Sequence, residues 1–372
     1  MERTGIANLP LHYGRCPSWI FEMMKRLGRA ISEIIIAEHG QSEFLKRLSD
    51  PYFFQAFGCV LGFDFHSSGL TVTTLGALKE ARLDDIGIFV CGGKGKTSRK
   101  TPEEIEQFSG NVSLSTKKIE NLKYSSRMAA KVDSAAIQDG YQLYHHAFVF
   151  SENGSWAVIQ QGMNANNRYA RRYHWLSDEV KGFVEEPNNA ICCDKKEARV
   201  LDMTASESRG ARKISVEVVN EKRFLKFFRD NSLNSFLKNE IKILSMPQHH
   251  FIKELSRQTK KSLEKAYEIQ PENYEELLSI QGIGPKSIRA LALISELVYG
   301  SPPSWQNPVK FSFAHGGKDH VPFPVDKKTY EKSVEILRTA IDNAKMGAGE
   351  QLRAMERLSK FLSPLPRRSS SL

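Results

Sequence analysis

The sequence predicts an α+β protein in which a mixed α/β domain with a β-hairpin core is followed by an all-helical domain. Three observations support this fold class. Apolar residues recur at helical spacing near the N-terminus, two apolar and aromatic runs flank a turn signal further on, and strand signals give way to helical ones near 210–222. We place the mixed domain at 1–215, the helical domain at 222–362 and a disordered tail at 363–372.

The first half of the mixed domain is predicted to contain three helices and one short buried strand. Thr101 and Pro102 give one helix its start signal, because a threonine N-cap before proline, with Glu104 three residues on, forms a capping box. The expected helices cover 18–48, 102–110 and 115–138, and the strand covers 86–91.

The centre of the mixed domain is predicted to be a β-hairpin. Residues 143–150 and 156–161 are apolar, aromatic runs, and the turn signal between them contains Asn153 and Gly154. Beyond residue 222 the apolar spacing becomes helical, and the proline-rich stretch at 301–324 is expected to be an ordered loop. The helices expected in this part cover 250–268, 274–280, 329–343 and 346–362.

The composition limits the class of protein. Forty per cent hydrophobic residues can bury a sizeable core, and no apolar run is long enough to span a membrane. The N-terminus lacks the basic and apolar segments of a secretion signal, and none of the five cysteines forms a C-x-x-C pair, so we expect a cytoplasmic protein with reduced thiols. A net charge of +10 favours a polyanionic partner such as nucleic acid.

The clearest motif lies at 273–299 and resembles the helix-hairpin-helix element of DNA repair proteins. Glycines at 282 and 284 permit a tight turn and a close approach to a DNA backbone. The second helix starts at Pro285, so its first N–H groups can bind a phosphate. Such contacts are independent of base sequence; the alternative is a glycine turn between two core helices. The expected DNA contacts are Gly282, Ile283, Gly284, Lys286, Ser287 and Arg289.

A weaker resemblance connects this motif to the DNA glycosylase and AP lyase branch of the superfamily. In that branch a lysine two residues after the second hairpin glycine attacks a sugar carbon, and a catalytic aspartate follows. Lys286 matches the lysine, but Asp326 lies about twice as far from Gly284 as the pattern requires. The alternatives are an N-cap role for Asp326 and a phosphate contact for Lys286.

Further motifs are spread along the chain. They are RTGIA at 3–7, GGKGK at 92–96, QDGY at 138–141, HH at 145–146, QQGMN at 160–164, ARRYHW at 170–175 and HGGKD at 315–319. With these motifs the chain resembles, over nearly its entire length, the family of domain of unknown function 763. The resemblance implies no particular reaction.

Polar residues crowd the predicted hairpin, whose strands should otherwise be apolar. Burying them unpaired would cost roughly several kcal/mol, which either a hydrogen-bond network or a metal ion offsets. We expect a divalent ion, Mg or Mn, bound by Asp139 and His146, with Gln161 orienting water. His145 points to the other face of its strand and is the alternative ligand if the strand register is opposite. The predicted catalytic residues are Asp139, His145, His146, Gln161, Lys94 and Lys96.

Three basic segments complete the predicted DNA-binding surface. The loop at 92–96 can bind a phosphate through backbone N–H groups and its lysines, but it lacks a Walker A pattern, so no nucleotide cofactor is expected. Arg171 and Arg172 lie among aromatic residues, a mixture suited to DNA, and Lys318 belongs to a second glycine loop. The alternatives are a surface loop, a packed strand and a simple turn.

Three functions compete. The lead interpretation is a divalent-metal-dependent nuclease of DNA repair, in which 1–215 cuts and 222–362 holds the DNA. The alternatives are a glycosylase or AP lyase centred on Lys286 and Asp326, and a non-catalytic DNA-binding protein. In each case the expected partner is DNA, no membrane is involved, and a homodimer is left open.

Overall fold

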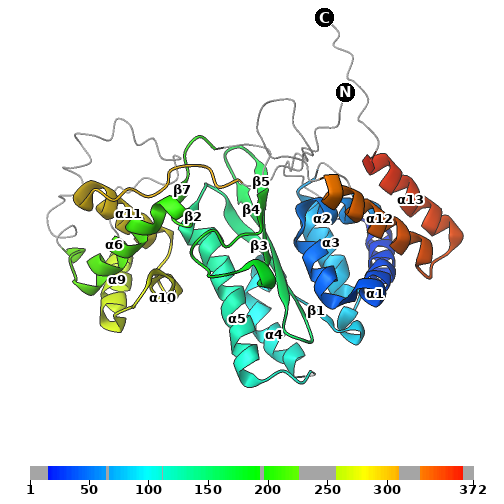
Figure 1. The fold of residues 1–372 in the computed structure, drawn as a ribbon, viewed down its shortest axis with the longest axis horizontal. Helices are drawn as coiled ribbons and strands as arrows, with labels where there is room; N and C mark the ends of the chain where they lie inside the picture. Colours follow the sequence, from blue (N-terminus) through cyan, green and yellow to red (C-terminus); the bar gives the residue numbers. More distant parts are fainter. Residues whose placement is uncertain are drawn as a thin grey trace, which may run out of the picture.

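The structure is a computed structural model of the 372-residue chain. It describes residues 16–63, 67–110, 112–192, 197–225, 257–309 and 327–362. Lys318, Asp326 and the tail at 363–372 lie outside the described residues. Within the described ranges the protein has the predicted α+β class, with one five-stranded antiparallel sheet and helices on both of its faces (Figure 1).

The predicted β-hairpin is confirmed and forms the centre of the sheet. Its strands pair with Phe150 opposite Trp156, and Gly154 takes the positive φ of 92° that the turn requires. The predicted strand at 86–91 is also confirmed, starting two residues later, and it pairs with the first hairpin strand. In spatial order the strands are β1 (Ile88–Lys94), β3 (Gln142–Ser151), β4 (Trp156–Asn164), β5 (Tyr169–Leu176) and β6 (Ala190–Cys192).

Helices from both ends of the chain cover one face of the sheet. Val90, Ala147 and Val149 on this face pack into the same core as the helices. The predicted helix at 18–48 is confirmed, with a bend at Gly40, where φ is 85°. The helices of this layer are α1 (Ser18–Ser49), α2 (Pro51–Val60), α3 (Gly69–Glu80), α12 (Lys327–Asn343) and α13 (Ala348–Leu362).

The opposite face of the sheet carries aromatic residues, and its core continues into the remaining helices. Phe148, Phe150 and Trp175 belong to the same buried cluster as Leu277 and Leu291, so the core runs from the sheet into the region of the hairpin motif. The helices of this part are α4 (Thr101–Ser109), α5 (Thr116–Lys131), α6 (Arg209–Asn220), α9 (Arg257–Ile269), α10 (Tyr274–Ser279) and α11 (Pro285–Tyr299).

The helix predicted at 115–138 is shorter than expected. After Lys131 the backbone forms a π-helical turn, Val132–Ala136, and then a short strand pair. The pair consists of β2 (Ile137–Gln138) and β7 (Leu201–Asp202). Single 3₁₀ turns lie at Leu83–Ile86, Gly95–Lys100, Ser177–Glu179 and Ser206–Ser208.

The predicted capping box of α4 is wrong. Thr101 lies inside the helix, and its hydroxyl donates to the carbonyl of Ser98 at 2.7 Å instead of accepting from the helix. The carboxylate of Glu104 turns away to accept from the backbone N–H of Gly92 and from the ammonium of Lys79, both at 2.7 Å. Glu104 therefore ties α4 to β1 and α3. Among the described residues, no helix has the length and apolarity needed to cross a membrane.

Candidate nucleic-acid interface and buried polar networks

The hairpin between α10 and α11 is a tight turn that requires glycine. The N–H of Ile283 donates to the carbonyl of Ile280 at 3.2 Å, and Gly282 has a positive φ of 100°. A Cβ atom at position 282 would also lie 2.9 Å from the hydroxyl of Ser262 on α9, so the turn packs directly against that helix. The chain then enters α11 at Pro285, and within the described residues no side chain caps the start of the helix.

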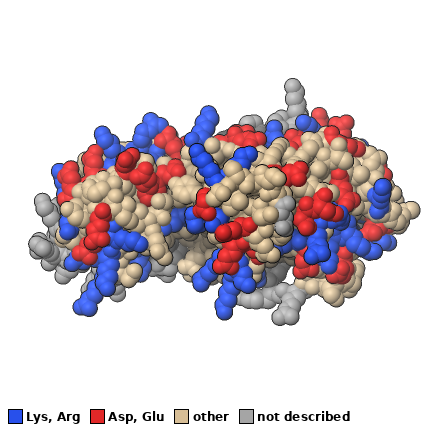
Figure 2. Space-filling view, turned by 90° about the horizontal axis from the view of Figure 1, so that it is seen from below, with Lys and Arg blue, Asp and Glu red and all other residues tan. Residues whose placement is uncertain are grey.

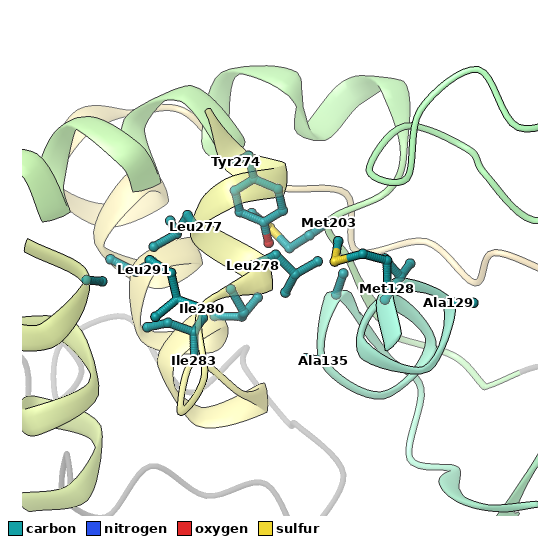
Figure 3. Close-up of a cluster of buried hydrophobic side chains, with 14 of the residues drawn as sticks. Met128, Ala129, Ala135, Met203, Tyr274, Leu277, Leu278, Ile280, Ile283 and Leu291 are labelled. Carbon is teal, nitrogen blue, oxygen red and sulfur yellow. The ribbon is translucent and has the colours of Figure 1, made fainter. Parts of the chain in front are cut away.

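The hairpin is fixed to the body of the protein by apolar contacts. Ile280 and Ile283 are buried and pin the turn to its helices, so Ile283, expected to contact DNA, has its side chain in the core. They belong to the same cluster as Met128 on α5 and Ala135 in the π-helical turn (Figure 3). The position of the turn is therefore set by the core beneath it.

Polar contacts fix the same hairpin to the end of α5. The ammonium of Lys131 donates to the carbonyl of Ile280 at 2.9 Å, and the amide of Gln138 donates to the carbonyl of Pro285 at 2.8 Å. The guanidinium of Arg289 in turn donates to the side-chain oxygen of Gln138. Both ends of the turn are thus bound to the segment between α5 and β3.

The structure divides the predicted hairpin contacts into exposed and buried residues. Lys286 and Gly282 are exposed, so a phosphate can reach them from solvent. Ser287 and Arg289 are buried, and burial lowers the pKa of Arg289 to about 10. Because the Arg289 guanidinium is bound to Gln138, its role is to position the hairpin, and it is not a surface contact for DNA.

A row of cations on α9 adjoins the hairpin and is absent from the sequence prediction. Arg257, Lys261 and Lys265 are spaced four residues apart, which places them on one side of the helix, and all three are exposed. The spacing is visible in the sequence. However, only the contact between α9 and Gly282 shows that the row adjoins the hairpin.

Asp139, a predicted metal ligand, is occupied by protein donors. Its carboxylate accepts from the guanidinium of Arg171 at 2.8 Å, from the hydroxyl of Tyr173 at 2.6 Å and from the backbone N–H of Tyr141 at 2.9 Å. The same guanidinium lies over the Tyr141 ring, 4.5 Å from its centre. Arg171 is fully buried, so its predicted role as a DNA contact is replaced by an internal ion pair.

His146, the other predicted ligand, belongs to a chain of hydrogen bonds. Its Nε2 bonds with the hydroxyl of Ser126 at 2.9 Å, and its Nδ1 bonds with the side-chain oxygen of Gln160 at 2.8 Å. The amide of Gln160 then donates to the carboxylate of Asp133 at 2.5 Å. Burial lowers the pKa of His146 to about 4, so the ring is neutral at pH 7.

These contacts occupy every atom through which Asp139 and His146 are predicted to bind a metal ion. Both ring nitrogens of His146 and both carboxylate oxygens of Asp139 already have protein partners. Among the described residues, no group of three or more His, Cys, Asp or Glu side chains is arranged to hold a metal ion. The geometry therefore fits the hydrogen-bond network better than a metal site at Asp139 and His146.

Arg172, predicted to contact DNA, is also buried, on the opposite face of the sheet. Its guanidinium donates to the side-chain oxygen of Gln55 at 3.1 Å and to the hydroxyl of Thr71 at 3.3 Å. It also lies over the Phe54 ring, 4.7 Å from its centre. Arg172 thus joins β5 to α2 and α3 and does not reach the surface.

His145 and Gln161 stand directly opposite each other on this second face. Among the described residues, neither ring nitrogen of His145 has a hydrogen-bond partner, and the side-chain oxygen of Gln161 has none. The amide of Gln161 donates to the carbonyl of Ser68 at 2.8 Å and to the hydroxyl of Tyr144. Burial, with smaller contributions from His146 and Lys94, lowers the pKa of His145 to about 3.

The glycine-rich loop lies beside this pair. Lys94 is the partner of His145 in the neighbouring strand, and its ammonium lies 5.9 Å from the centre of the Tyr144 ring. Lys94 and Lys96 are both exposed. Gly92 cannot be replaced without movement, because a Cβ atom there would lie 2.2 Å from the carbonyl oxygen of His146. The loop thus places the cation of Lys94 next to unpartnered buried polar atoms.

A family model described as "Protein of unknown function (DUF763)" matches residues 5–325. The chain belongs to this family. No curated protein and no solved structure matches the chain. The DUF763 match covers the sheet, both polar networks and the hairpin, and it ends before α12 and α13 begin.

Several of the motifs noted in the sequence meet in the sheet. The segments at 92–96, 145–146, 160–164 and 170–175 lie on four neighbouring strands or at their ends. The segment at 138–141 contributes Asp139 to the same region. Polar residues of different motifs therefore contact one another, as His146 does with Gln160 and Asp139 with Arg171.

Proposed function

We propose that the protein binds DNA through sequence-independent contacts between the backbone of the DNA and the hairpin. The observation that carries the proposal is the start of α11. The helix begins at Pro285 without a side-chain cap, and the exposed Lys286 stands in its first turn. Open N–H groups and a cation at a helix N-terminus favour a phosphate group.

The attachment of the hairpin supports the same proposal. Ile280 and Ile283 are buried, and Lys131 and Gln138 hold the backbone on either side of the turn. A turn that is already fixed loses little conformational entropy when it binds, so more of the contact energy appears as affinity.

Replacing Lys286 tests this function. In the Lys286→Glu variant a phosphate meets a carboxylate, so we expect the Kd for DNA at low salt to rise about tenfold or more, equally for unrelated sequences. Fluorescence anisotropy with two duplexes of different sequence measures the change. The matched control is Lys345→Glu, an exposed lysine between α12 and α13. Equal affinities for the two variants would remove the hairpin from the binding surface.

A second candidate function is hydrolysis of DNA, centred on His145 and Gln161 in place of Asp139 and His146. The observation that favours it is the set of unpartnered atoms beside Lys94, namely both ring nitrogens of His145 and the side-chain oxygen of Gln161. A neutral imidazole can accept a proton from water, and Lys94 and Lys96 can bind the phosphate. Because His145 is buried, access for DNA requires the loop at 92–96 to move. No observation on the described residues favours the glycosylase interpretation, since Asp326 lies outside them.

The His145→Gln variant tests this second candidate. With labelled single-stranded, duplex and forked DNA, each with Mg²⁺, Mn²⁺ or chelator, we expect the variant to lose cleavage while its Kd for DNA stays unchanged. Retained cleavage would place the chemistry elsewhere. Absence of product from the wild type on every substrate would leave a non-catalytic DNA-binding protein.

A further inference from the structure

The cations of α9 lie on the side of that helix that adjoins the hairpin. Ser262 is the α9 residue that Gly282 contacts. Successive residues turn by about 100° around a helix. Around the circumference of α9, Ser262 lies between the buried residues Leu263 and Ala266 on one side and the exposed Lys265 on the other. The cationic row therefore begins directly next to the hairpin.

The row continues along α9 away from Lys265. Lys261 and Arg257 follow at four-residue steps, each about 6 Å further along the helix axis. Within the described residues none of the three forms an ion pair, whereas Lys260, on another side of α9, lies 3.7 Å from Glu264. The nearest carboxylates on α9 are Glu264, three residues after Lys261, and Glu268, three residues after Lys265. Three cations that form no ion pair with another described residue, next to an open helix N-terminus, form an extended surface for anionic ligands.

Among the described residues, the surface lacks the exposed aromatic side chains that bind unpaired bases. Single-stranded nucleic acid is held by exposed aromatic rings on which bases stack. Tyr267, at the end of α9, is only partly exposed and lies beneath the ammonium of Lys222, 4.4 Å from the ring centre. Among the described residues the large exposed apolar side chains include one aromatic residue, Trp19, and it lies on α1. α1 and α9 stand at opposite ends of the molecule (Figure 1).

Charges elsewhere on the molecule are mixed. Figure 2 shows Lys and Arg side chains interspersed with Asp and Glu over the face seen from below. The net charge of +10 therefore does not make the whole surface attractive to DNA. A binding surface is distinguished from this background by a local row of Lys and Arg side chains that form no ion pair with another described residue.

We propose that the hairpin and the α9 row of Arg257, Lys261 and Lys265 form one continuous surface that binds duplex DNA by its backbone, in preference to single-stranded DNA. This inference rests on the proposed DNA-binding function and gives it a substrate class and a second contact element. Phosphates bound by the hairpin lie at one edge of the surface, and the row contacts phosphates further along the duplex.

The salt dependence of binding tests this inference. Each phosphate contact contributes about 0.9 to the slope of log Kd against log salt for duplex DNA. Replacing Arg257, Lys261 and Lys265 together by Gln should therefore lower the slope by roughly 2 to 3 between about 50 and 200 mM salt. The matched control removes three exposed cations on α12, α13 and their connection: Arg338, Lys345 and Arg353, each to Gln.

The outcomes separate this inference from the function on which it rests. We expect the wild type to bind a short duplex at least about tenfold more tightly than either of its single strands, and the control to keep the wild-type slope. If the triple variant behaves like the control while Lys286→Glu still weakens binding, the row is not part of the surface and the hairpin function stands. Tighter binding of single strands overturns the substrate class. No binding of any DNA by the wild type overturns the proposed function itself.

Discussion

Asp133 is a buried carboxyl group whose charge state bears on stability. Its carboxylate is inaccessible to solvent and accepts from Gln160 at 2.5 Å, from Trp175 at 2.8 Å and from Asn188 at 2.9 Å. The pKa of Asp133 is raised to about 7, chiefly by burial and in addition by the charge of Asp139. The three hydrogen bonds act in the opposite direction and lower it. The protonated form is therefore favoured more in the folded protein than in the unfolded one.

This raised pKa predicts a pH-dependent contribution to the free energy of unfolding. A carboxyl group whose pKa is higher in the folded protein than in the unfolded chain stabilises the folded protein fully below the pKa of the unfolded chain. For Asp133 this stabilisation is lost as pH rises through about 7. His145 and His146 act oppositely, because their lowered pKa values cost stability as pH falls below about 6.5. The difference in free energy of unfolding between the wild type and Asp133→Asn, measured with urea, isolates the contribution of the Asp133 carboxyl group. We expect the wild type to lose stability relative to the variant between about pH 5 and 7; a constant difference would contradict the raised pKa.

Single residues also show where the sequence is a sufficient guide. Alternation along a strand predicts that His145 and His146 face opposite sides of the sheet, and they do. It does not predict that Arg171 and Arg172 are buried, because a basic and aromatic run is typical of a surface strand. Their partners, Asp139 and Gln55, come from distant parts of the chain and cannot be inferred from the run itself.

At the scale of elements, the hairpin and the π-helical turn form one unit. Lys131 at the end of α5 and Gln138 in β2 hold the carbonyls of Ile280 and Pro285, so the hairpin cannot shift without moving the segment between them. That segment also contains Asp133, whose hydrogen bonds reach into the sheet. The position of the hairpin turn is thereby set from the centre of the molecule.

Removing the Gln138 contact should weaken DNA binding without removing any surface charge. In Gln138→Leu the hairpin loses its bond at Pro285 and Arg289 loses its acceptor. We expect a Kd several-fold higher, since one buried hydrogen bond contributes about 1 kcal/mol, with an unchanged salt slope. The control, Gln351→Leu, removes a glutamine that bonds the carbonyl of Ile341 at the other end of the molecule. Wild-type affinity in the Gln138 variant would mean that the hairpin does not need this support.

The helices and strands are mostly predictable from periodicity, and their ends are less so. The hairpin strands and the helices at 18–48 and 274–280 follow directly from apolar spacing. The end of α5 does not, because the sequence after Lys131 remains compatible with a helix. The hydrogen bonds of Asp133 and Gln138 to other elements accompany the change of backbone there, and such contacts are not encoded locally.

At the scale of the whole molecule, sequence order and spatial order differ. The predicted boundary near 215–222 stays a prediction, although one apolar core extends across it, from the sheet through α6 to α11. The last helices, α12 and α13, pack on α1 and α2 and are separated from α9, α10 and α11 (Figure 1). Periodicity predicts that these helices exist and which side of each is apolar, but it does not tell which distant surface they cover.

The packing of α12 and α13 on α1 and α2 also bears on how the protein forms during synthesis. Arg47 of α1 donates to Ser333 of α12 at 3.2 Å, a contact between residues 286 positions apart. A ribosome releases the first helices long before the last ones, at roughly 5–20 residues per second. Until then the part of α1 and α2 that α12 and α13 cover stays open, so the nascent chain exposes apolar side chains there that a chaperone can bind.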